Sequence, residues 1–379
     1  MKQAGAESAL LVSIDLGNAD YRESLEELRL LAKTAGVSVL ATVEAKRVRP
    51  DAALFAGSGK VREIAELVER MEIPLVIFNH DLSPAQMRNL SSVLHTRVID
   101  RTMLILDIFA QRAQSHEGKV QVELAQLKYL ATRLVGLNAD MGQQKFAVGA
   151  RGPGETQLEL DRRKLDKRVH LLKERLQKLK HQREVQRRSR NRSGVFSVSI
   201  VGYTNAGKST LFNRLTRANV YVANQLFATL DTTSRQMYAE GAGEIVLSDT
   251  VGFMRHLPHG LVAAFRSTLE ETIQADLLLH VVDASNPNRD DQIAEVNKVL
   301  SEIDAGSIPQ LMVLNKVDVA GMMPGVERDE YGRIDRIFLS AKSGEGLDGL
   351  KLALTEARDA NAERIENQIN KREMSHGIE

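Results

Sequence analysis

Gly202-Tyr203-Thr204-Asn205-Ala206-Gly207-Lys208-Ser209 is the stretch that decides the fold of the region around it. The alternating run Val195 to Val201 precedes it and predicts a strand, and the pattern Thr210 to Leu215 follows and predicts a helix. A strand, a loop with two spaced glycines and a helix are typical of a phosphate-binding loop, whose backbone N–H groups face phosphate oxygens. Lys208 would neutralise the β- and γ-phosphates, and the Ser209 hydroxyl would ligate Mg²⁺. The stretch therefore predicts a nucleoside triphosphate site.

A second motif, Asp249-Thr250-Val251-Gly252, ends the strand-like run Glu244 to Ser248. Asp249 would hold Mg²⁺ through a water molecule, and the Gly252 N–H would reach the γ-phosphate. Between the two motifs, Phe227-Ala228-Thr229-Leu230-Asp231 is the candidate first switch, in which Thr229 closes onto Mg²⁺ when the γ-phosphate is present. We expect catalytic roles for Lys208, Thr229 and Gly252, and a Mg²⁺ site formed by Ser209, Thr229 and, through water, Asp249.

Two motifs near the end of this region select the base. Leu311 to Leu314 ends in Asn315-Lys316-Val317-Asp318, and the Asp318 carboxylate can accept the N1 and N2 protons of guanine, a donor pair that adenine lacks. A backbone N–H of Ser340-Ala341-Lys342 can bond guanine O6. Together the motifs predict a GTP site in a Ras-like G domain with a doubly wound, mostly parallel sheet.

The full set of residues that we expect to bind the nucleotide consists of these motifs and the first residue of the following helix. It is Gly202, Tyr203, Thr204, Asn205, Ala206, Gly207, Lys208, Ser209, Thr210, Phe227, Ala228, Thr229, Leu230, Asp231, Asp249, Thr250, Val251, Gly252, Asn315, Lys316, Val317, Asp318, Ser340, Ala341 and Lys342.

Phe253 follows Gly252, at the position where Ras-like GTPases carry the glutamine that orients the attacking water. Phenylalanine cannot orient water, so we expect slow intrinsic hydrolysis that accelerates when a partner or a rearranged switch orders the water. Arg255, His256 and His259 lie close by in the sequence, and residues of these types are more often surface residues than catalytic ones.

The N-terminal third alternates strand-like and helix-like stretches, which predicts an α/β domain with a mostly parallel sheet. From about Glu117 the pattern becomes helical, with one heptad seam from Val120 to Leu134 and another from Leu165 to Leu179. The simplest way to bury both seams is a long antiparallel helical hairpin, although each could pack on another surface. We expect four parts: an α/β domain at 1–116, the hairpin at 117–193, the G domain at 194–359 and a polar C-terminal tail at 360–379.

The segment between the two seams, residues 136–155, would form the tip of the hairpin and ends in the run Arg151-Gly152-Pro153-Gly154-Glu155. A glycine-rich loop at the end of a stalk can enter a narrow site on a large partner, although a flexible connector would have the same composition. Residues 151–193 carry 15 basic and 6 acidic side chains, net +9. This excess favours contact with phosphates, and a solvated helix face is the alternative.

The whole chain has 51 Lys and Arg against 50 Asp and Glu, a net charge of +1 and no cysteine. These numbers argue against a disordered acidic chain, a globally basic packaging protein, a disulfide framework and cysteine chemistry. The longest apolar runs are too short for a membrane span. We therefore expect a cytoplasmic protein.

Phe55-Ala56-Gly57-Ser58-Gly59-Lys60 looks like half of a second phosphate loop, but it lacks the first glycine of that spacing. Val61 follows in place of Ser or Thr. A tight turn with a helix start is the favoured interpretation, and a phosphate or RNA contact is the alternative.

Several longer strings resemble the HflX family of translational GTPases, in the group that also holds the Obg-like proteins. The resemblance covers about residues 10 to 358, through Phe227 to Asp231 and the runs Asn79 to Gln86, Val98 to Thr102, Leu104 to Arg112, His116 to Lys119, Gln121 to Leu127, Arg151 to Leu158 and Asp161 to Arg163. It implies binding to the 50S ribosomal subunit, and in some members separation of stalled 70S ribosomes under heat or antibiotic stress. It also implies that Arg151, Gly152, Pro153, Gly154 and Glu155 approach the peptidyl-transferase region and contact rRNA.

Two departures from the family pattern matter. Many relatives have proline at the position of Thr232, so the exit of the first switch is expected to be less rigid. Many also carry a small extra C-terminal domain, whereas a polar tail follows here, so a contact that depends on that domain is not expected.

The leading hypothesis is a monomeric, Mg²⁺-dependent GTP hydrolase that binds the 50S subunit and separates 70S ribosomes. A ribosome-assembly or RNA-binding GTPase switch without splitting is the alternative. A signalling GTPase with a protein effector and no RNA would explain the GTP motifs but not the basic stalk.

Overall fold

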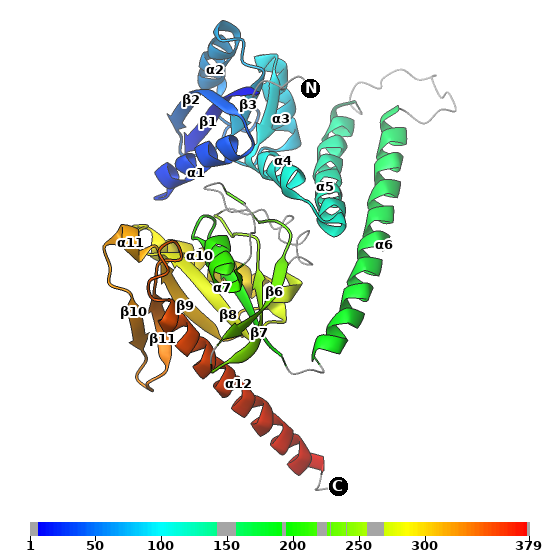
Figure 1. The fold of residues 1–379 in the computed structure, drawn as a ribbon. Helices are drawn as coiled ribbons and strands as arrows, with labels where there is room; N and C mark the ends of the chain where they lie inside the picture. The colour runs from blue at the N-terminus through cyan, green and yellow to red at the C-terminus, as the bar shows by residue number, and fades with distance from the viewer. Residues whose placement is uncertain are drawn as a thin grey trace. The chain divides into compact units, whose positions relative to one another are not determined.

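A parallel four-stranded sheet in the order β2-β1-β3-β4 forms the first folded unit of the computed structural model (Figure 1). The structure describes residues 7–141, 157–191, 195–217, 226–227, 229–239, 241–255 and 269–376. They divide into two compact units, up to Leu179 and from Lys180 onward. The elements of the sheet unit are β1 (Ser8–Asp15), α1 (Tyr21–Thr34), β2 (Ser38–Lys46), α2 (Ser58–Arg70), β3 (Leu75–Phe78), α3 (Pro84–Leu94), β4 (Arg97–Asp100) and α4 (Arg101–Arg112).

The sheet is covered on both faces, because its central strands are apolar on both sides. Leu10, Val12 and Phe78 pack in one cluster with residues of α2 and α3. Leu11 and Ile77, which alternate with them along the strands, are equally buried toward the opposite face. This two-sided burial is typical of parallel strands joined by helices and confirms the expected N-terminal α/β domain.

The two heptad seams pack on each other. They lie on α5 (His116–Met141) and α6 (Gln157–Asn191). Val120, Leu124 and Leu127 form one cluster with Val169, Leu172 and Leu176. Arg168 Nε donates a hydrogen bond of 2.7 Å to Glu123 Oε1 beside this seam. The expected helical hairpin is therefore confirmed, while most of its tip, including Arg151 to Glu155, lies outside the described residues.

An ion pair between a partly buried arginine and a buried carboxylate attaches α5 to the sheet domain. Arg133 Nη2 lies 2.8 Å from Asp100 Oδ2, and Arg133 Nη1 donates to the Leu82 carbonyl. Asp100 is fully buried and also accepts from Met103 N at the start of α4. Burial raises the pKa of the Asp100 carboxyl, and the Tyr129 hydrogen bond and the charge of Arg133 oppose that rise. Asp100 thus holds three elements relative to one another: α4, α5 and the turn that precedes α3.

The second unit contains a seven-stranded sheet in the order β10-β11-β9-β8-β5-β7-β6. The five central strands are parallel, and β10 and β6 run antiparallel at the two edges. This is the expected doubly wound G-domain sheet. Its elements are β5 (Phe196–Gly202), α7 (Lys208–Thr216), β6 (Thr233–Ala239), β7 (Gly243–Asp249), α9 (Glu270–Ile273), β8 (Leu277–Asp283), α10 (Arg289–Glu302), β9 (Gln310–Asn315), α11 (Val317–Ala320), β10 (Gly325–Arg328), β11 (Ile334–Phe338) and α12 (Leu347–His376).

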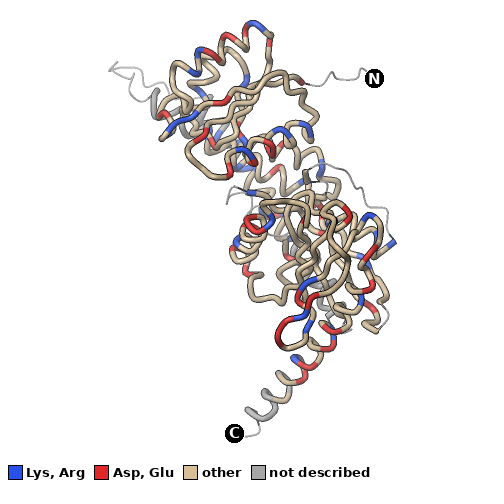
Figure 2. The backbone as a smooth tube through the Cα atoms, turned by 90° about the vertical axis from the view of Figure 1, so that its left-hand side faces the viewer, with Lys and Arg blue, Asp and Glu red and all other residues tan. Residues whose placement is uncertain are grey.

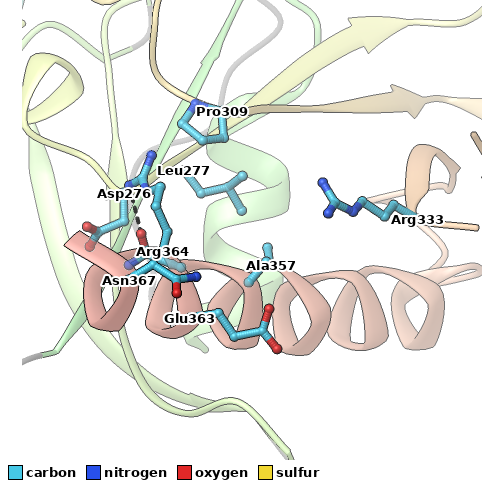
Figure 3. A pocket seen from close by; sticks show the side chains of 10 residues that line it. Asp276, Leu277, Pro309, Arg333, Ala357, Glu363, Arg364 and Asn367 are labelled. Carbon is cyan, nitrogen blue, oxygen red and sulfur yellow. Dashed lines mark hydrogen bonds between the residues drawn. The ribbon is translucent and has the colours of Figure 1, made fainter. Parts of the chain in front are cut away.

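The last helix continues through most of the segment that the sequence suggests is a polar tail. Leu350 and Leu354 of α12 are fully buried against the sheet, and the helix runs on to His376. A pocket of about 570 Å³ lies between this extension and the amino ends of β8 and β9, lined by Asp276, Pro309, Arg333 and Arg364 (Figure 3). The phosphate-loop motif lies at the opposite edge of the sheet, because β5 ends there.

Lys and Arg are interspersed with Asp and Glu along both units (Figure 2). Among the described residues, no helix is both long enough and apolar enough to cross a bilayer.

We expect Asp100→Asn to lower the free energy of unfolding of the N-terminal unit by about 2 kcal/mol, because it leaves the Arg133 guanidinium without its carboxylate while still capping α4. Urea denaturation followed by circular dichroism would measure the change. Glu66→Gln, an exposed change on α2, is the control and should stay within about 0.5 kcal/mol of the parent. Equal stability of the two variants would contradict the prediction.

Candidate nucleotide-binding and catalytic site

The four motifs predicted from the sequence meet at one edge of the seven-stranded sheet. β5 ends in Gly202, β7 in Asp249 and β9 in Asn315, and the Ser340 loop follows β11. These strands are parallel, so their carboxyl ends lie together. β7 and β8, the next two parallel strands along the chain, lie on opposite sides of β5, so the strand order reverses at this point. Ligands of open α/β sheets bind at such a reversal, which favours this edge over the pocket below α12.

Both glycines of the phosphate loop occupy positions that other residues could not. Gly202 has φ 146°, and a Cβ there would lie 2.2 Å from the Val281 carbonyl oxygen. Gly207 has φ 96°, and a Cβ there would lie 2.2 Å from Asn315 Nδ2. Each side chain would therefore clash with a neighbouring strand or loop as well as strain the backbone.

Lys208 is buried at the start of α7, and its ammonium group spans the loop. Nζ donates to the Gly202 carbonyl at 3.1 Å and to the Tyr203 carbonyl at 2.8 Å. Burial lowers the pKa of Lys208 to about 8, and the charge of Asp249 opposes that shift. A bound triphosphate would favour the charged form, because it supplies negative charge next to the ammonium.

The three residues expected to hold Mg²⁺ lie within hydrogen-bonding distance of one another. Ser209 Oγ donates to Asp249 Oδ2 at 2.7 Å, and Thr229 Oγ1 donates to the same oxygen at 3.0 Å. The two hydroxyl oxygens are 2.8 Å apart. Asp249 is fully buried, and burial raises the pKa of its carboxyl.

This cluster fits a magnesium ion. Asp249 Oδ1 is buried and has no hydrogen-bond partner among the described residues. A buried carboxylate with one spare oxygen, beside two hydroxyls, matches the oxygen ligands that Mg²⁺ shares with phosphates and water. When bound, the ion would neutralise charge on the phosphates. The chain contributes the hydroxyls of Ser209 and Thr229 and the carboxylate that keeps them together.

Asn315 joins the base-recognition loops to the phosphate loop. Its Nδ2 donates to the Ala206 carbonyl at 2.8 Å, and its Oδ1 accepts from Ala341 N at 2.9 Å. Lys316 follows with φ 66°, and its Nζ lies 2.6 Å from Asp283 Oδ2. Asp318 is exposed at the start of α11, so its carboxylate is accessible to a base.

The segment after Gly252 is attached to the phosphate loop through its backbone. Thr204 N donates to the Phe253 carbonyl at 2.7 Å, and Phe253 N donates to the Gly202 carbonyl at 3.1 Å. Phe253 is 2% exposed. The residue at the glutamine position is therefore held in place by main-chain bonds and has no polar side-chain atom to offer to water.

Arg255 is buried, unlike the surface residue that its type suggests. Its N–H donates to the Tyr203 hydroxyl at 2.9 Å, and its Nη2 lies 3.1 Å from Asp291 Oδ2 of α10. His256 and His259 lie outside the described residues. Arg255 thus links the phosphate loop, the segment after Gly252 and α10.

A polar connection joins the segment that follows the first switch to the segment that precedes the second switch, Asp249 to Gly252, and it has no sequence signature. Glu271 of α9 accepts hydrogen bonds from Ser234 on β6 and, at 2.9 Å, from Ser248 on β7. The next residue, Thr272, lies 3.2 Å from the Ser199 hydroxyl of β5. The spacing of Ser234 and Ser248 could not reveal this connection, because it depends on β6 pairing with β7.

The apolar residues among those expected to bind the nucleotide are buried within the loops. Phe227 and Leu230 are each 2% exposed, and Val317 is 1% exposed. The Thr250 hydroxyl donates to the Ile200 carbonyl at 2.7 Å, which fixes the loop to β5. Ala228 lies outside the described residues. These side chains position the loops whose backbone and polar groups face the site.

We expect the affinity for a GTP analogue to fall as the pH rises through 8, because Lys208, with a pKa of about 8, then loses its proton and its attraction for phosphate. Between pH 7 and 8.5 the fall should be about fourfold for a single deprotonation. Titration with a fluorescent analogue would measure it. Lys208→Arg should bind more weakly and without this pH dependence, since arginine keeps its charge. A flat wild-type profile would contradict the assignment.

We expect Asn315→Ala to weaken GDP binding by about tenfold or more, because it removes both bonds that join the phosphate loop to the Ser340 loop. Isothermal titration calorimetry would measure the dissociation constant. Asn297→Ala, an exposed change on α10, serves as the control and should bind GDP like the parent. Unchanged affinity in Asn315→Ala would show that the loops are held by other contacts.

Three family models match successive parts of the chain. A model described as GTP-binding GTPase N-terminal matches residues 22–110, and one described as GTP-binding GTPase Middle Region matches residues 112–190. A third, described as 50S ribosome-binding GTPase, matches residues 197–316.

Curated relatives and a solved structure agree with these models. GTPase HflX of Escherichia coli K12 is 53% identical over 351 residues, which cover 92% of this chain and 82% of that protein. GTPase HflX of Caldanaerobacter subterraneus subsp. tengcongensis is 47% identical, with 92% and 80% covered. A crystal structure of SsGBP in complex with GDP aligns with a TM-score of 0.51 at 25% identity, over 93% of this chain and 99% of that one. With the site geometry above, these matches show that the chain belongs to the HflX family of GTPases and is a GTP hydrolase.

Proposed function

We propose that this GTPase binds the large ribosomal subunit in its GTP state and separates stalled or idle 70S ribosomes into subunits, as part of a stress response. The description of the matching family model supports a ribosomal partner. The carrying observation is the contact of Thr229 with Ser209 and Asp249, because it connects the first switch to the groups that hold the metal and phosphates.

The switch mechanism follows from that contact. Thr229 and the Gly252 N–H lie on two segments that can both respond to a γ-phosphate, and Lys208 neutralises the charge that they face. Ser209, Thr229 and, through water, Asp249 would hold Mg²⁺, which would supply positive charge beside the phosphates. Without the γ-phosphate, Thr229 loses the contacts that hold the first switch closed over the nucleotide. The GTP and GDP states therefore differ in the surface that they present.

Binding energy to the ribosome must favour the GTP conformation over the GDP one, because a partner with equal affinity for both states shifts nothing. The excess of basic residues between 151 and 193, net +9, supplies attraction to rRNA phosphates. The loop of Arg151, Gly152, Pro153, Gly154 and Glu155 is the part proposed to enter the ribosomal site. The protein acts as a monomer in the cytoplasm. Its four parts are separated after residues 116, 193 and 359.

A ribosome-assembly or RNA-binding switch that separates no subunits is the second candidate. The same basic segment favours this candidate, because electrostatic binding to RNA does not by itself separate the ribosomal subunits.

Sedimentation of 70S ribosomes with the protein and a non-hydrolysable GTP analogue tests the proposal. We expect 30S and 50S peaks with the parent chain, because the GTP state displaces an intersubunit contact. Ser209→Ala should leave 70S intact, since it removes a magnesium ligand. Arg151→Ala should separate subunits less efficiently with its analogue affinity unchanged. A shifted 50S or intact 70S peak would favour the second candidate, and no co-sedimentation would contradict both.

A further inference from the structure

Thr204 is a buried threonine of the phosphate loop whose hydroxyl makes no hydrogen bond within the described residues. Thr204 is only 7% exposed. Its backbone N–H is bonded to Phe253, but Oγ1 has no hydrogen-bond partner among the described residues. An unpaired buried hydroxyl costs folding free energy, so its presence requires an explanation.

The surroundings of Thr204 place its side chain next to the expected position of the γ-phosphate. A Cβ placed on Gly252 would lie 2.8 Å from Thr204 Cγ2 and 3.0 Å from Lys208 Nζ. The Thr204 side chain, the Lys208 ammonium and the Gly252 backbone therefore lie close together. Lys208 and Gly252 are the groups expected to contact the γ-phosphate, so Thr204 lies beside the position of the reacting phosphorus.

The glutamine that orients water in Ras-like GTPases is absent here, because Phe253 follows Gly252. Phe253 has no polar side-chain atom, and its main-chain N–H and carbonyl are both bonded to the phosphate loop. The attacking water must nevertheless be aligned with the γ-phosphorus for in-line displacement. A threonine hydroxyl can accept one hydrogen bond from water while donating its own proton to a phosphoryl oxygen.

We propose that Thr204 is a catalytic residue whose hydroxyl holds the attacking water against the γ-phosphate. The water oxygen forms a bond to the γ-phosphorus as the bond from that phosphorus to the β,γ-bridging oxygen breaks. The bridging oxygen keeps the electron pair and leaves with GDP, and the water proton passes to an oxygen of the released phosphate. The hydroxyl itself is unchanged at the end of the reaction. The assignment rests on the GTP site and is independent of ribosome binding.

Single-turnover GTP hydrolysis by the full chain, with Thr204→Val and Thr204→Ser, tests the proposal. Valine keeps the shape of threonine and removes the hydroxyl, so the rate should fall by at least about tenfold. Serine keeps the hydroxyl and should stay within about threefold of the parent. Both variants should bind GDP within about threefold of the parent, because the hydroxyl is assigned to the water and the γ-phosphate, and GDP lacks the γ-phosphate.

Thr216→Val is the matched control. Its hydroxyl donates to the Phe212 carbonyl at the end of α7, away from the loop, so its hydrolysis rate should equal that of the parent. A parental rate in Thr204→Val would overturn the proposal. So would a serine variant as slow as the valine one, or a loss of GDP affinity equal to the loss of rate, since either result would assign Thr204 to packing. If the parent chain itself failed to bind the analogue, the GTP site and not the role of Thr204 would be at fault.

Discussion

The buried carboxylate of Asp249 is the interaction on which the nucleotide site depends. One of its oxygens accepts from Ser209 of α7 and from Thr229 of the first switch, and the other is unpaired among the described residues. Three segments that are far apart in the sequence are therefore held at one point, at the end of β7. Such a carboxylate is costly to bury without a cation nearby, which fits the magnesium ion proposed at this point.

Much of this arrangement could be predicted from the sequence, because strand ends carry the motifs. The spacing from Gly202 to Ser209 fixes a loop between a strand and a helix, and the seams around Val120 and Leu172 fix a hairpin. The remaining contacts depend on which strands become neighbours. The bond of Asn315 to Ala206, the ion pair of Arg255 and the junction at Asp100 join residues whose separation in sequence has no periodic signature.

The two switches are joined outside the nucleotide site as well as within it. Glu271 bonds to Ser234, five residues after Thr229, and to Ser248, which directly precedes Asp249. This connection lies on the sheet behind the site, and it makes the exit of one switch depend on the position of the other. Sequence motifs describe what touches the nucleotide, whereas tertiary contacts of this kind describe how its presence is transmitted.

The pairing of Phe253 with the phosphate loop sets an energetic threshold for any activator. Two backbone hydrogen bonds, each with a net stabilisation of about 0.5–1.5 kcal/mol, hold this segment in place. A partner that displaces it must bind the displaced form more tightly by about 1–3 kcal/mol, or roughly 5- to 150-fold in affinity. Lys208 would keep its bonds to the carbonyls of Gly202 and Tyr203 during that displacement. An activator could therefore move the segment after Gly252 without breaking the bonds of Lys208 within the phosphate loop.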